Sequence, residues 1–95
     1  MAIFTIRVEL HNAQFSHYLA LAKSLQAAGI VDVVKDDTSG ILYKMSPGEY
    51  SYVGNATLDT VFDACVTAAN ATGQKNAVFV SECSARKWIG LPVVK

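Results

Sequence analysis

Cysteine and proline are scarce in this chain, and neither sign of charge is in excess. Cys65 and Cys83 are its only 2 cysteines, and neither has the closely spaced Cys or His neighbours of a zinc site or a dithiol redox motif. The 8 Lys and Arg residues balance the 8 Asp and Glu residues, so no long-range field draws the chain to nucleic acid or to an anionic membrane. Only local basic patches are left for binding nucleic acid.

Long apolar runs are also absent. No window reaches the length of a membrane span, and Arg7 and Glu9 interrupt the run that a signal peptide would need at the N-terminus. We therefore expect a cytoplasmic protein that does not enter the membrane. The apolar share of 52% is high for a domain of 95 residues, and the net charge of zero removes a barrier to self-association. Both features predict a homodimer.

Strict alternation of apolar and polar residues near the N-terminus predicts a strand that is buried on one side. Every second residue from Phe4 to Leu10 is apolar, whereas Thr5, Arg7 and Glu9 lie between them. A period of two sends the two sets to opposite faces of a strand. Because the rest of the chain supplies elements that would cover or extend this strand, we place it at the centre of the sheet.

Two later segments have the apolar periodicity of helices. Asn12 is the expected N-cap of the first helix, which would start near Ala13 and end at Gly29. Thr57 is the expected N-cap of the second helix, which Gly73 would end. The predicted buried stripe of the first helix is Phe15, Leu19, Ala22 and Leu25, widened by Tyr18, Leu21 and Ala28. The stripe of the second helix is Leu58, Val61, Phe62, Cys65 and Ala69.

The remaining strands are predicted at residues 30–35, at one of two places between the helices, and at residues 77–81. Residues 41–45 and 49–54 both suit the third core strand. We favour 49–54, because it leads directly into the second helix, and treat 41–45 as an extension or hairpin arm. The order β-α-β-β-α-β predicts an α+β, ferredoxin-like (split βαβ) two-layer sandwich over residues 1–83. Residues 84–95 would form a C-terminal extension that packs on the dimer partner.

The candidate catalytic residues gather near the end of the first strand, where Arg7, Glu9 and His11 follow one another at intervals of two. Histidine transfers protons at neutral pH, and a glutamate from each of two chains could together hold a divalent cation. No set of metal ligands and no cofactor is identified. The alternative interpretation is that these are ordinary solvated surface side chains.

Two further segments are candidates for binding RNA. The run from Tyr50 through Tyr52 to Val53 resembles the third-strand motif of RNA-recognition domains, whose aromatic rings stack on bases. Alternatively, the two tyrosines pack against a dimer partner or a C-terminal strand. The run Arg86-Lys87-Trp88 combines charge with an aromatic ring and could hold a phosphate backbone or stack on a base.

One family shares the order and lengths of these segments. The strand Phe4 to Leu10, the run Lys23-Ser24-Leu25 that ends the first helix, the segment Val33 to Asp37 before a polar hairpin, and Leu58 at the start of the second helix resemble the GhoS-type antitoxins of bacterial type V toxin–antitoxin systems.

The resemblance implies a ferredoxin-like fold related to the small CRISPR-associated endoribonucleases. It also implies an antitoxin that cleaves the messenger RNA of a membrane-lytic toxin. Glu9 corresponds to the acidic residue at the end of the first strand in those folds, and the tail from Leu91 to Val94 to a strand that crosses to the sister subunit. The alternative function is a non-catalytic dimeric module that binds a protein or a small ligand on its open sheet face.

Overall fold

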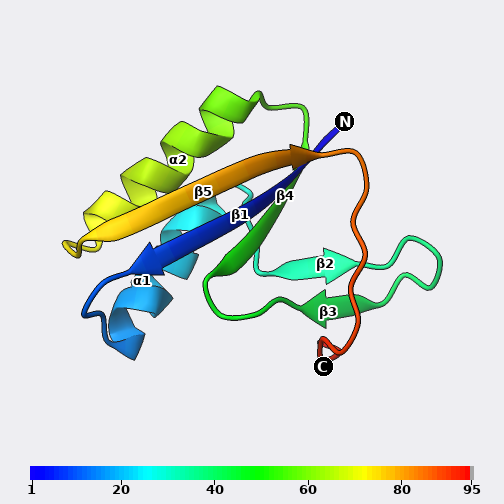
Figure 1. Cartoon of the computed structure of the whole chain (residues 1–95), viewed down its shortest axis with the longest axis horizontal. Helices are drawn as coiled ribbons and strands as arrows, with labels where there is room; N and C mark the ends of the chain where they lie inside the picture. The colour runs from blue at the N-terminus through cyan, green and yellow to red at the C-terminus, as the bar shows by residue number, and fades with distance from the viewer. Residues whose placement is uncertain (95) are drawn as a thin grey trace.

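The computed structural model describes residues 1–94, which form two helices and two antiparallel sheets (Figure 1). The helices are α1 (Phe15–Ala27) and α2 (Leu58–Ala71). The larger sheet has the strand order β4 (Glu49–Gly54), β1 (Ala2–Leu10), β5 (Asn76–Cys83), and the smaller pairs β2 (Val33–Lys35) with β3 (Leu42–Lys44). The predicted α+β class is confirmed.

Strand β1 is the centre of the larger sheet, as its alternation predicts. It pairs antiparallel with β4 on one side and with β5 on the other, so that Ile6 faces both Tyr50 and Val80. Its apolar residues Phe4, Ile6, Val8 and Leu10 are at most 6% exposed. The polar residues between them lie on the opposite face.

The third core strand is β4, so the choice of residues 49–54 over 41–45 is confirmed. The segment 41–45 contains β3 instead, which forms a hairpin arm with β2. A tight turn at Gly48 carries the chain from this arm into β4. Gly48 has a φ of 82°, and the amide N–H of Val8 donates to its carbonyl oxygen at 2.8 Å. A Cβ at this position would lie 3.0 Å from the carbonyl oxygen of Val8, so glycine is required there.

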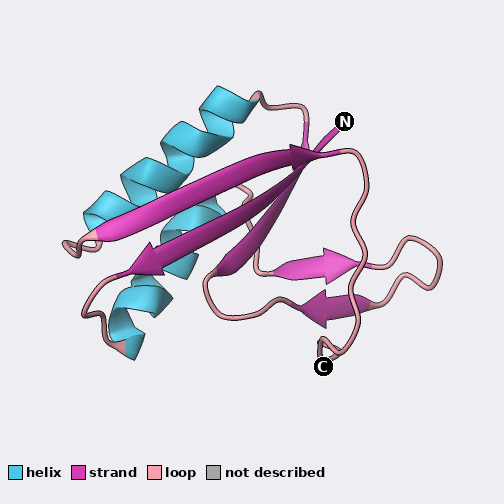
Figure 2. Ribbon diagram, in the orientation of Figure 1, coloured by secondary structure: helices cyan, strands magenta, loops and turns pink. Residues whose placement is uncertain are grey.

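Both helices cover one face of the larger sheet and leave the other face without a helix (Figure 2). Leu21 and Leu25 of α1 and Val61 and Cys65 of α2 join the even positions of β1 in a single buried cluster. Neither α1 nor α2 is long and apolar enough to span a membrane.

The start of α1 and its buried face differ from the expectation. Asn12 lies in a turn with a φ of 54° rather than capping the helix, and Gln14 takes the N-cap position. Phe15 is 77% exposed and Leu19 is 56% exposed. The reason is the side chain of Tyr18, whose hydroxyl accepts from the Leu10 amide at 3.1 Å and so fixes the rotation of the helix against the end of β1.

The second helix agrees better with the sequence. Thr57 caps it as predicted, because its Oγ1 accepts from the Thr60 amide at 3.2 Å. Val61, Cys65 and Ala69 are buried as predicted, whereas Leu58 is 42% exposed and Phe62 is 41% exposed, at the edge of the predicted stripe. The centre of the buried face of α2 is therefore the one that the sequence predicts.

The C-terminal extension runs from the end of β5 back across the smaller sheet (Figure 1). The Lys44 amide donates to the Pro92 carbonyl at 2.8 Å, and the Val94 amide donates to the Leu42 carbonyl at 2.9 Å. The extension thus pairs with β3 of its own chain, and Lys95 lies outside the described residues. Its packing on a dimer partner stays a prediction.

The orientation of α1 can be tested with two leucines of the same helix. Leu25→Ala should lower the free energy of unfolding by about 2–5 kcal/mol, because it leaves a cavity in the core. Leu19→Ala should change it by less than about 0.5 kcal/mol, since that side chain is mostly in solvent. Urea denaturation measures both values. Equal losses in the two variants would mean that the helix presents another face to the sheet.

The buried thiol and phenol of the core predict a loss of stability in alkali. Burial raises the pKa of Cys65 from 9.0 to about 11, and burial, with the charge of Asp32, raises the pKa of Tyr50 from 10.0 to about 12. Above pH 9 the unfolded chain therefore ionises before the folded chain, so the free energy of unfolding should fall between pH 9 and 12.

Urea denaturation of wild type at pH 8 and pH 11 measures this fall. Tyr50→Phe should make it smaller, because the phenol that only the unfolded chain ionises is gone. Tyr43→Phe, which changes a half-buried ring outside the core, is the control. An identical pH dependence in Tyr50→Phe and wild type would contradict the assignment.

Candidate functional site

The face of the larger sheet that no helix covers carries most of the predicted catalytic groups. The register places Thr5 between Ser51 and Ser81, and the next pair of positions places Arg7 between Glu49 and Phe79. Because side chains alternate along each strand, all these residues project from the same face. We refer to this face as the open face.

Glu9 and His11 meet at the end of β1. His11 Nε2 lies 3.0 Å from Glu9 Oε1, and both side chains are about half exposed. The turn that brings them together is fixed by the His11 amide, which donates to the Lys75 carbonyl at 2.8 Å. An ionised carboxylate can only accept, so in the neutral ring the proton lies on Nε2 and the lone pair on Nδ1. His11 therefore offers Nδ1 as a base, and the Glu9 carboxylate holds the imidazole ring in a fixed orientation.

Arg7 lies on the same face, two residues before Glu9 along β1. This spacing corresponds to about 7 Å along the strand. Within residues 1–94, its guanidinium has no carboxylate within ion-pair distance. The structure thus brings the three predicted catalytic residues onto one line, with Glu9 and His11 in contact and Arg7 beside them.

The donor groups needed for a metal site are sparse in the described part of the chain. No cluster of three or more His, Cys, Asp or Glu side chains occurs within residues 1–94. Glu9 and His11 alone offer two ligands. A divalent cation at Glu9 would take its further ligands from a second chain or from water, as the sequence interpretation assumes.

Tyr50 and Tyr52 lie on the helix side of the sheet, not on the open face. Tyr50 pairs with Ile6 and Tyr52 pairs with Phe4, so both share the parity of the core. Tyr50 is 5% exposed, and the Tyr52 ring lies 5.9 Å from that of Phe4. A base cannot stack on Tyr50 without unpacking the core, which corrects the expectation for this residue. The alternation in this segment did not reveal which of its residues face the helices, because tyrosine suits either face of a sheet.

Arg86 crosses the open face from the C-terminal extension. Its Nη1 donates to Ser51 Oγ at 3.0 Å and to Thr5 Oγ1 at 3.4 Å. The sequence singled out Arg86, but not the hydroxyl groups that hold it. They come from strands far apart in the chain, so only the register could reveal that they are neighbours.

Cys83 joins the same row of polar groups, since its Sγ lies 3.4 Å from Thr5 Oγ1 and 3.8 Å from Ser81 Oγ. The hydrogen bond with Thr5 foremost, then those with Ser81 and the charge of Arg86, lower the pKa of this thiol. The second cysteine, Cys65, is buried in the core. Only Cys83 thus combines solvent access with a stabilised thiolate.

The other two residues of the basic run lie beside the smaller sheet. Lys87 is exposed, and the half-buried Trp88 ring lies 6.0 Å from the ring of Tyr43. Glu9 lies four positions along β1 from Thr5, which Arg86 contacts, and this spacing corresponds to about 13 Å along the strand. The basic run and the Glu9–His11 pair therefore occupy two ends of the same side of the molecule.

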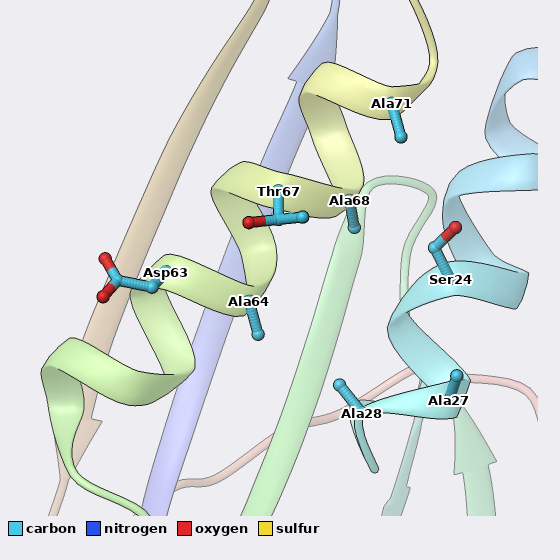
Figure 3. Close-up of a pocket in the computed structure, with 8 residues that line it drawn as sticks. All are labelled: Ser24, Ala27, Ala28, Asp63, Ala64, Thr67, Ala68 and Ala71. Atoms are coloured by element: carbon cyan, nitrogen blue, oxygen red, sulfur yellow. The ribbon is translucent and has the colours of Figure 1, made fainter.

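A shallow groove of about 430 Å³ runs between the two helices (Figure 3). Alanines dominate its lining, and its polar residues are Ser24, Asp63 and Thr67. Figure 3 shows Asp63 pointing away from α1. Small aliphatic side chains supply no group for catalysis or for holding an ion, so the groove is a weaker candidate than the open face.

No protein-family model matches this chain, and no curated protein matches it. The candidate site is therefore defined by its geometry.

The state of Cys83 can be measured by alkylation. Because Thr5 stabilises the thiolate, Thr5→Val should slow the reaction of Cys83 with iodoacetamide at pH 7.5. Mass spectrometry of the folded protein, with Cys65 as the buried internal reference, gives the rate. Thr67→Val, on the exposed face of α2, is the control. An unchanged rate in Thr5→Val would show that the hydrogen bond does not govern the thiol.

Proposed function

We propose that this chain binds RNA on its open face and cleaves it, as an antitoxin of the GhoS type would act on toxin messenger RNA. The observation that carries the proposal is the hydrogen bond of 3.0 Å between His11 Nε2 and Glu9 Oε1. A carboxylate that orients an exposed imidazole is the arrangement that general base catalysis needs. A cytoplasmic location agrees with this role, since messenger RNA is found there.

RNA carries its own nucleophile, the 2′-hydroxyl, next to the scissile phosphate. His11 Nδ1 takes the proton of this hydroxyl while the oxygen attacks phosphorus. The bond from phosphorus to the 5′-oxygen breaks, and the departing oxygen takes a proton from water. The products are a 2′,3′-cyclic phosphate and a 5′-hydroxyl end. Glu9 stabilises the imidazolium that forms, and Arg7 stabilises the negative charge on the phosphate oxygens.

The basic run of the C-terminal extension gives this site a second point of contact with the strand. Arg86 and Lys87 neutralise phosphates, and Trp88 offers a ring for a base. Both ends of the site lie on the same side of the sheet. An RNA strand that extends from Arg86 past Arg7 reaches His11.

A ferredoxin-like arrangement is the finer part of the fold proposal. The order β4, β1, β5 supports it, as does an isolated bridge that places Val31 beside Ser51 of β4. With the segment 30–35 as the fourth strand of the layer, the order of elements becomes that of the split βαβ fold. Strand β3 and the extension are then additions at one edge.

The alternative function, a non-catalytic dimeric module, has its own observation in favour. Phe79 is 68% exposed and Val53 is 51% exposed on the open face. Two large apolar side chains on one sheet face are the kind of surface that a second copy or another protein covers. In this alternative, Glu9 and His11 are a solvated surface pair.

The two functions are separated by titrating single-stranded RNA at low salt, following both mobility and strand cleavage. His11→Ala should reduce cleavage by about 10²–10⁴-fold, because the general base is lost. Glu9→Gln should reduce it less, since the ring stays in place but its imidazolium loses a counter-charge. EDTA should leave the rate unchanged, because the step described needs no metal.

His17→Ala is the matched control, as His17 is the second of the 2 histidines and lies on α1. Cleavage that is the same in His11→Ala and wild type would overturn the choice of site. Cleavage that EDTA abolishes would replace the base mechanism with a metal-dependent one. A protein that neither shifts nor cleaves RNA but elutes as a dimer would support the interaction module.

A further inference from the structure

A second cavity lies between the C-terminal extension and the sheets, at the end of the open face away from His11. Its volume is about 340 Å³, within the range of small-molecule sites, which begins near 300 Å³. Thr5 and Glu49 line it from the larger sheet, Val34 from β2, and Arg86, Lys87 and Trp88 from the extension. It is formed only because the extension folds back across the smaller sheet (Figure 1).

Arg86 is a half-buried cation that has no acidic partner among residues 1–94. Its Nη1 is held by the hydroxyls of Ser51 and Thr5, which are neutral. The ion pairs within residues 1–94 join His11 to Glu9 and Lys44 to Asp32, so none involves this guanidinium. Placing a charge where water is partly excluded is unfavourable unless an opposite charge compensates it. The two hydroxyls fix the position of the group and leave Nε and Nη2 to donate to an anion.

The rest of the lining narrows the class of anion. Lys87 supplies a second cation, which suits a phosphate better than a single carboxylate. Trp88 and Val34 supply an aromatic ring and an aliphatic wall, and such surfaces favour a flat, weakly polar group. Glu49 lines the cavity without an ion-pair partner among the described residues, and it can accept from N–H donors of a ligand.

We propose that this cavity binds a nucleoside monophosphate, with the phosphate on Arg86 and Lys87 and the base against Trp88. The choice of a nucleotide among ring-bearing anions rests on the proposed function, whereas the need for an anion follows from Arg86 itself. The same chemistry has two sources, a free nucleotide and the 5′-phosphorylated end of an RNA strand. The cavity would then fix the register of an RNA relative to the Glu9–His11 pair.

Trp88 is the only tryptophan of the chain, so intrinsic fluorescence reports on this cavity directly. Titration with UMP and AMP at low salt should change its emission in a saturable way. Inorganic phosphate should compete with them, and uridine should produce no saturation over the same concentration range. Displacement of UMP by a 5′-phosphorylated oligonucleotide but not by its 5′-hydroxyl form would identify the strand end as a ligand, and failure of both would identify the free nucleotide.

Arg86→Gln should weaken UMP binding by about tenfold or more, because a charge-assisted pair of hydrogen bonds is lost. Since Arg86 also bonds to Ser51 and Thr5, circular dichroism must show that this variant is folded. Lys87→Gln, which changes an exposed side chain, should weaken binding severalfold and decides the question if Arg86→Gln is unfolded. Lys23→Gln on α1 is the matched control and should bind like wild type.

The proposal is overturned if UMP causes no saturable change, or if folded Arg86→Gln or Lys87→Gln binds UMP as tightly as wild type. Its failure is distinguishable from that of the proposed function. His11→Ala should keep full UMP binding while it loses RNA cleavage. Wild-type cleavage without UMP binding would overturn the cavity alone, and UMP binding without cleavage would support the cavity and overturn the nuclease.

Discussion

Strand β1 buries Phe4, Ile6, Val8 and Leu10 on one face, and this burial holds the larger sheet in one register. Both edges of this strand are hydrogen-bonded, to β4 and to β5, so the strand cannot shift without breaking two ladders. A shift of its register by one residue would turn its apolar side chains toward solvent. The same constraint fixes the opposite parity, so Thr5, Arg7 and Glu9 must project from the open face. The core and the candidate site are thus two consequences of one alternation.

Arg86 links the C-terminal extension to this frame. By donating to hydroxyls on β1 and β4, it connects a segment without regular structure to two strands of the larger sheet. Thr5 takes part in two interactions, since its Oγ1 also lies near the Cys83 thiol. The charge of Arg86, the hydroxyl groups of Thr5 and Ser51, and the pKa of the Cys83 thiol are therefore coupled. An anion bound at Arg86 would therefore change the pKa of the Cys83 thiol, although the two groups come from different elements.

Several features that neighbouring residues decide were predicted correctly from the sequence, although the Asn12 cap was not. The alternation of β1, the Thr57 cap and the assignment of residues 49–54 to the third core strand could all be read from the sequence. The face of α1 could be read only in part: Leu21 and Leu25 are buried as predicted, whereas Phe15 and Leu19 are exposed. Several apolar stripes fit its composition, and the hydrogen bond that the Leu10 amide donates to Tyr18 selects one of them. The prediction that Tyr50 stacks on an RNA base failed for a similar reason. Tyrosine is amphipathic, so its burial depends on which residue of β1 it meets.

The candidate site was predictable only where its members are neighbours in the chain. Arg7, Glu9 and His11 are spaced by two along one strand and its turn, so the sequence places them on one side. The setting of Arg86 depends on the register of β1 with β4, which no single segment encodes. Pairing over such sequence distances is decided by the whole fold.

Zero net charge does not argue against an RNA site of this kind. At physiological ionic strength charges are screened over about 8 Å, so a bound phosphate responds to its nearest groups rather than to the total. Five of the 8 carboxylates are aspartates, and all five lie in loops or on α2, outside the strands of the larger sheet. Arg7 and Arg86 both have hydrogen-bond donors left for an anion, because neither forms an ion pair within the described residues. Recognition here would be short-ranged and dependent on geometry, which suits a protein that acts on a particular RNA rather than on any polyanion.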